Sequence, residues 1–230
     1  MAPPPIRGYA DLVSEYESVK AVYDQTGHAQ RVCDLLETYL PNSTVNKIVV
    51  MGIGQTAKGW RQLSMIMTVA EHLGVPTIHI FAQEDHSVDE VAGGERAEED
   101  MDKYAALYRD HLGVTFNEHE PDEPDVLRDV GPIVQRITAR TLVFAPLLPL
   151  VTTGAVLMGG KAWPEVYIGH TMDSIREACT DREDDVYEFA ERFEDLHDWI
   201  RLPRVDESED DDWNVRQGEF HRMALYWKDE

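Results

Sequence analysis

The sequence predicts an α/β protein with a Rossmann-like fold, in which a mostly parallel sheet carries helices on both faces within a single domain. Apolar, β-branched runs of strand length alternate along the chain with longer segments of helical periodicity. The 230 residues, 43% of them hydrophobic, are enough to bury one sizeable core. We therefore expect one domain over 1–230, with N-terminal helices in 1–45, the α/β core in 46–170, and an acidic helix and closing segment in 171–230.

The first part of the chain predicts two helices before the core begins. Apolar residues at helical spacing across Tyr9–Tyr39 indicate these helices, separated near Thr26-Gly27 and stopped by Pro41-Asn42. The run Lys47–Met51 is rich in β-branched residues, as is typical of a buried central strand. Further strands are predicted at 77–82 and 114–116, and helices at 57–72 and 101–111.

The second part of the chain continues this alternation and ends in an acidic helix. The predicted elements are a helix at 126–139, strands at 141–145 and 166–168, a helix at 152–158, a long helix at 173–200 and a closing segment at 220–227. Apolar residues recur in the long helix at helical spacing and are expected to face the core. They are Val186, Phe189, Ala190, Phe193, Leu196 and Ile200.

The loops that follow the strands form the expected ligand-binding edge, because open α/β sheets bind ligands beyond the carboxyl ends of their strands. This edge comprises 52–56, 83–86, 145–149 and 169–173. Gly52-Ile53-Gly54 comes between a strand and a helix, where a ligand can approach the backbone closely. The candidate substrate-binding residues are Gly52, Gly54, Thr56 and His170. Fold alone does not name a reaction.

Cofactor and metal motifs are incomplete in this sequence. Glu84 and Asp85 come about 30 residues after Gly54, beyond the spacing of roughly 20 in the dinucleotide fingerprint. The histidines are scattered and form no HExxH, and the two cysteines form no CxxC. A Gly-x-Ser-x-Gly nucleophile turn is also missing. We therefore expect no metal and no cofactor.

The charge balance is strongly acidic. Lys and Arg number 21 against 44 Asp and Glu, which gives a formal net charge of 21 − 44 = −23. General affinity for nucleic acid needs Lys and Arg to neutralise phosphates, so DNA is not an expected partner. No apolar stretch approaches the roughly 20 residues that span a bilayer, and no secretory signal is visible. We expect a soluble, cytoplasmic protein that does not bind membranes.

An acidic stripe follows one flank of the long predicted helix. Asp184, Glu188, Glu191 and Asp195 are spaced by four, three and four residues, so like charges repel along one face. One interpretation is a solvated face, natural in so acidic a chain. The other is a site for a cation, for which a guanidinium is suited because its planar fork engages a carboxylate through two hydrogen bonds.

Three segments of the core resemble the sensitivity-to-red-light-reduced (SRR-like) domain. They are IVVMGIGQT, FAQED and TLVFAPLLPL, and the resemblance covers roughly Lys47 to Ile168. What this resemblance implies is a regulatory role, without a defined reaction.

A second resemblance concerns Asp184-Asp185-Val186-Tyr187-Glu188, which is similar to the DDxxE motif of the fungal arginine-containing cyclodipeptide synthases. Tyr187 and Glu191 also resemble the Tyr-xxx-Glu spacing of the bacterial cyclodipeptide synthases, which share a Rossmann-like fold. The resemblance implies a cytoplasmic enzyme that condenses arginyl-tRNA with a second aminoacyl-tRNA into a cyclo(Arg-Xaa) diketopiperazine. In the bacterial enzymes the first loop carries a catalytic Ser, whereas this chain has Gly54.

The chemistry of this resemblance assigns the catalytic set to Asp184, Asp185, Tyr187, Glu188 and Glu191. A carboxylate such as Glu188 can bind the ammonium of the attacking amino acid and relay its proton. Either Thr56 substitutes for the missing Ser or the second amine attacks the ester directly. The expected basic contacts to tRNA are Lys58, Arg61, Arg128, Arg136 and Arg140. The alternatives are a non-enzymatic SRR-like regulatory protein and a methyltransferase that uses S-adenosylmethionine at the glycine loop.

Overall fold

The computed structural model describes residues 8–53, 57–83, 102–116, 132–146, 148–179, 185–203 and 223–228. Its centre is a seven-stranded sheet in the order β3-β2-β1-β4-β5-β7-β6. The strands are β1 (Lys47–Met51), β2 (Ile80–Gln83), β3 (Thr115–Phe116), β4 (Thr141–Ala145), β5 (Val166–His170), β6 (His197–Arg201) and β7 (Met223–Lys228). The α/β fold expected from the sequence is confirmed.

The sheet is mixed rather than parallel throughout. Strands β3, β2, β1, β4 and β5 pair in parallel, whereas β7 pairs antiparallel with both β5 and β6. The prediction of a mostly parallel sheet therefore holds for the five strands from β3 to β5 and fails at the edge made by β7 and β6.

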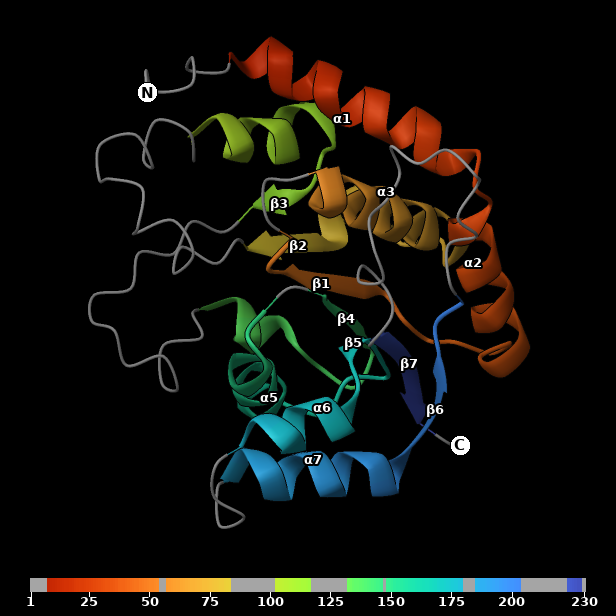
Figure 1. Cartoon of the computed structure of the whole chain (residues 1–230), viewed down its shortest axis with the longest axis vertical. Coiled ribbons are helices and arrows are strands. Elements are labelled where there is room, and N and C mark those ends of the chain that lie inside the picture. The colour runs from red at the N-terminus through yellow and green to blue at the C-terminus, as the bar shows by residue number, and fades with distance from the viewer. Residues whose placement is uncertain are drawn as a thin grey trace.

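Helices cover both faces of the sheet (Figure 1). One face carries α1 (Tyr9–Asp24), α2 (His28–Tyr39) and α3 (Ala57–His72), and the other carries α5 (Leu150–Gly159), α6 (Met172–Ala178) and α7 (Asp185–Leu196). The core is accordingly divided into two clusters by the sheet. Ile48 and Val50 of β1 enter the cluster under α1 to α3, and Val49 and Met51 enter the cluster under α5 to α7. Burial on both faces explains the continuous apolar run of β1.

The predicted continuous helix from Asp173 to Ile200 is wrong. The chain leaves the helical conformation at Cys179, whose φ of −74° and ψ of 129° are extended, and α7 starts afresh at Asp185. Beyond Leu196 the chain forms β6. Leu196 and Ile200 continue the helical spacing in the sequence but do not belong to the buried face of a helix. Leu196 is 58% exposed, and Ile200 lies in β6, where side chains alternate between the two faces.

Other predicted elements differ in detail. The predicted strand 77–82 begins with a 3₁₀ turn, η1 (Thr77–His79). The predicted helix 101–111 ends in a π-helical turn, η3 (Leu107–His111). Of the predicted helix 126–139, residues 126–131 lie outside the described residues and the rest supplies only the 3₁₀ turn η4 (Pro132–Arg136). The predicted strand 166–168 extends two residues further, through His170.

A half-buried arginine joins α6 to α7. The Arg176 guanidinium donates hydrogen bonds to the carboxylates of Asp173 and Glu194. The side chains of Arg176 and Glu194 are 21% and 19% exposed, so water screens this pair only in part. Glu194 thus links α7 to α6 through its ion pair with Arg176.

Replacing Arg176 with Met should lower the free energy of unfolding by about 1–2 kcal/mol, because Glu194 would keep a half-buried charge without its partner. Arg192→Met is the matched control. Arg192 lies 3.6 Å from Glu188 with both side chains more than half exposed, so its removal should change stability by less than about 0.5 kcal/mol. Urea unfolding of the two variants measures the difference; equal losses would contradict this account.

A buried histidine lies where α7 meets β6. The His197 ring stacks on Phe193 with ring centroids 3.9 Å apart, and its Nδ1 and Nε2 lie 2.9 and 3.3 Å from the carbonyl oxygens of Phe193 and Pro164. Burial lowers the pKa of His197, and the two carbonyl oxygens offset this only in part. His197 is therefore neutral in the folded protein around neutral pH.

The free energy of unfolding should fall when the pH drops below about 6.5, the pKa of an unfolded His. Below this pH the unfolded chain binds a proton at His197, whereas the folded protein does not, because its His197 pKa is lower. The loss grows until the pH reaches the folded-state pKa. Urea unfolding between pH 7.5 and 5.5 measures it, and His197→Asn should show a smaller pH dependence. Stability that rises as the pH falls would mean that the two carbonyl oxygens outweigh burial.

Candidate functional site

The carboxyl ends of the parallel strands form one edge of the sheet, and the strand order reverses between β1 and β4 at this edge. Such a switch point is where open α/β sheets bind ligands. Gly52 follows β1 here with a φ of +63°, and its N–H donates to the Gln83 carbonyl oxygen at 3.1 Å. A Cβ on Gly52 would lie 2.9 Å from the Leu148 side chain. Both the turn and the contact with Leu148 require glycine, independently of any ligand.

The other predicted substrate-binding residues have different outcomes. Gly54 and Thr56 lie outside the described residues. His170 was expected to follow its strand but is the last residue of β5, half-buried and paired with Met223 of β7. By strand alternation, the His170 side chain is on the face covered by α1 to α3.

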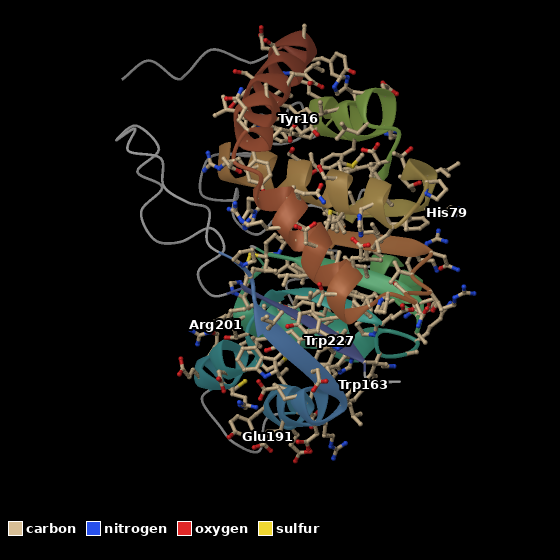
Figure 2. All side chains as sticks on the ribbon, turned by 90° about the vertical axis from the view of Figure 1, so that its right-hand side faces the viewer. Tyr16, His79, Trp163, Glu191, Arg201 and Trp227 are labelled. Atoms are coloured by element: carbon tan, nitrogen blue, oxygen red, sulfur yellow. The ribbon has the colours of Figure 1, made fainter. Side chains whose placement is uncertain are left out.

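The acidic residues of α7 lie together on its outer face. Asp185, Glu188 and Glu191 are exposed, whereas Val186, Phe189, Ala190 and Phe193 are buried. Figure 2 shows Glu191 on the side of α7 away from the sheet. Tyr187 is half-buried, and Asp184 lies outside the described residues. Glu188 and Glu191 are therefore neighbours on a face opposite to the one that packs on the domain.

The gap between the glycine turn and α7 is filled by α5. Leu148 and Leu150 pack at the start of α5, and one turn later Gly154 allows close approach of α7. A Cβ on Gly154 would lie 2.3 Å from Val186 Cγ1. The structure thus holds the first turn of α7 close to α5. It does not place Glu188 and Gly52 in one common site.

Of the predicted basic contacts to tRNA, the three whose side chains the structure describes do not form a patch at the carboxyl edge. Arg140 Nε donates to the Thr44 carbonyl oxygen at 3.1 Å, which places Arg140 at the amino ends of β1 and β4. The Arg136 guanidinium lies 4.8 Å from the centre of the Phe81 ring, and Arg61 is buried. Arg128 and the side chain of Lys58 lie outside the described residues.

Two buried polar side chains at the carboxyl edge were not singled out from the sequence. Gln83 ends β2, and its side chain is nine-tenths buried. Tyr167 of β5 is fully buried, which raises the pKa of its hydroxyl, and this hydroxyl occupies the space that a Cβ on Gly169 would take, 2.3 Å away. The signal was present, since Tyr167 and Gly169 alternate onto the same face and Gln83 starts a loop of the expected edge.

Metal and membrane features are absent from the parts of the chain that the structure describes. Within the seven described segments, no group of three or more His, Cys, Asp or Glu side chains is arranged to hold a metal ion. None of the described helices has the length and apolar character to cross a bilayer.

Comparison with known proteins identifies the family. A family model described as the SRR1 domain matches residues 32–227. No curated protein matches the sequence. The match supports the SRR-like resemblance and gives no support to the resemblance to cyclodipeptide synthases. It runs from α2 to β7 and so includes the whole sheet. The chain therefore belongs to the SRR1-domain family.

Proposed function

We propose that this SRR1-family protein is an aminoacyl-transferring enzyme, an arginine-containing cyclodipeptide synthase that joins arginyl-tRNA to a second aminoacyl-tRNA. One observation carries the proposal. Asp185 and Glu188 lie on the first two turns of α7 at helical neighbour spacing, and both are exposed. Among the described residues, Glu188 makes a long 3.6 Å ion pair with Arg192, and its exposed carboxylate remains available to an incoming cation.

The proposed reaction needs alignment and removal of one proton for each bond formed. Glu188 accepts a proton from the α-ammonium of one aminoacyl ester, and the resulting amine attacks the carbonyl carbon of the other ester. A C–N bond forms, the ester C–O bond breaks, and the first tRNA leaves with its hydroxyl restored. The second amine then attacks the remaining ester, which closes the six-membered ring and releases the second tRNA.

The arginine side chain would be recognised through its planar guanidinium. Two parallel N–H groups of a guanidinium match the two oxygens of one carboxylate, and Asp185 and Glu191 flank Glu188 on the same face. Because these carboxylates are exposed, each contact is weak until the substrate excludes water. A bulky tRNA-bound substrate supports such exclusion better than free arginine does.

A non-enzymatic regulatory protein is the second candidate. The observation that favours it is the outward direction of the α7 carboxylates, which also suits a solvated helix face. The methyltransferase hypothesis depends on the glycine turn alone, and Leu148 fills the space beside Gly52. Calorimetry with S-adenosylmethionine tests that hypothesis directly.

Expression of the full chain in a bacterial host should release cyclic dipeptides that contain arginine, detected by mass spectrometry of the medium. Glu188→Gln should reduce the product at least about 100-fold, because an amide cannot accept the ammonium proton. Glu177→Gln is the control, since Glu177 is an exposed acid of the neighbouring helix α6, outside the acidic stripe of α7. This control should retain most of the product.

Two results would count against the proposal. The absence of any such product from folded, well-expressed protein would favour the regulatory alternative. Full activity of Glu188→Gln would remove Glu188 from the mechanism. Circular dichroism of both variants checks that the fold is intact.

A further inference from the structure

Gln83 carries a buried amide oxygen that has no hydrogen-bond partner among the residues the structure describes. Gln83 is 9% exposed, and its Oε1 accepts no hydrogen bond from the described part of the chain. Buried polar atoms are nearly always hydrogen-bonded, since leaving one unpaired is destabilising. Those that stay unpaired therefore need a reason. A bound group that completes the hydrogen bond is one such reason.

Backbone contacts fix Gln83 at the carboxyl edge, on the strand next to β1. Gln83 is in register with Met51 of β1, and its carbonyl oxygen accepts the hydrogen bond from Gly52 N–H at 3.1 Å. Strand alternation places the Gln83 side chain on the same face as Phe81 and Met51, the face covered by α5. Both neighbours are apolar, so neither offers a donor to Oε1.

The chemistry of the unpaired atom selects the ligand. An amide oxygen needs a donor, which a phosphate or carboxylate does not supply, and the net charge of −23 disfavours anions. In the dinucleotide-binding α/β fold, an acidic residue near the end of the second strand accepts a hydrogen bond from the ribose. Gln83 ends β2 and holds the equivalent place in this fold, although it follows Gly54 by about 30 residues rather than roughly 20. An amide suits a hydroxyl because each can both donate and accept.

We infer that Gln83 is the ribose-binding residue of a nucleoside site at the carboxyl edge between β1 and β2. The hydroxyl of the bound ribose donates to Gln83 Oε1. This inference goes beyond aminoacyl transfer and does not depend on the carboxylates of α7. The nucleoside can be free or the terminal part of a larger substrate.

The test compares adenosine with 2′,3′-dideoxyadenosine, binding to the full chain by calorimetry and ligand-observed NMR. Wild-type protein should bind adenosine about tenfold more tightly, the effect of one hydrogen bond. Gln83→Leu should lose this factor and bind both nucleosides alike. Gln30→Leu is the matched control, an exposed Gln on α2 that should keep the tenfold preference.

Thermal unfolding of the ligand-free variant gives a second readout. Because Leu removes an unpaired polar group, Gln83→Leu should leave the Tm unchanged or raise it. A lower Tm would show that the amide already has a partner within the protein and would overturn the inference. So would the absence of adenosine binding, or a tenfold preference that survives in Gln83→Leu. Adenosine binding without any cyclic dipeptide product would sustain this inference and reject the proposed synthase.

Discussion

The structure depends on the burial of β1 and β4 on both faces. Every residue of β4 and four of the five in β1 are buried, with alternate side chains entering opposite core clusters. Helices on only one side would leave half of these apolar side chains in water. Two helical layers are therefore obligatory, and the carboxyl ends of the central strands become the natural place for loops that bind ligands.

The acidic residues of α7 lie in two different environments. Glu194 is half-buried against Arg176 and ties α7 to α6, while Glu188 is exposed and paired only loosely with Arg192. An exposed carboxylate keeps its hydration and costs the fold little, so it is free to meet a ligand. The same physics leaves a solvated acidic face equally stable without one. The structure thus distinguishes Glu194, which joins α7 to α6, from the exposed carboxylates of the same helix.

The sequence predicted the parallel part of the fold well because strands buried on both faces consist of continuous apolar runs. Lys47–Met51 and Thr141–Ala145 formed strands with the expected bounds. The edge was missed because Leu196 and Ile200 mimic helical spacing although β6 begins at His197. The sequence singled out the acidic residues of α7, whose role stays a prediction, but not Gln83, since the lack of a hydrogen-bond partner depends on three-dimensional surroundings that spacing does not reveal.

The reversed strand at the sheet edge constrains how the molecule is assembled. β7 comes after β6 in the chain yet lies between β5 and β6. The described hydrogen bonds that attach β6 to the sheet are made to β7, and β7 in turn pairs with β5. β6 therefore joins the sheet only through β7. Both strands must join as a unit, late and over a long sequence separation, which slows closure of this edge. A nascent chain that has made β6 but not β7 would hold Trp199 and Ile200 beside an unfinished sheet, where association with other chains competes with folding.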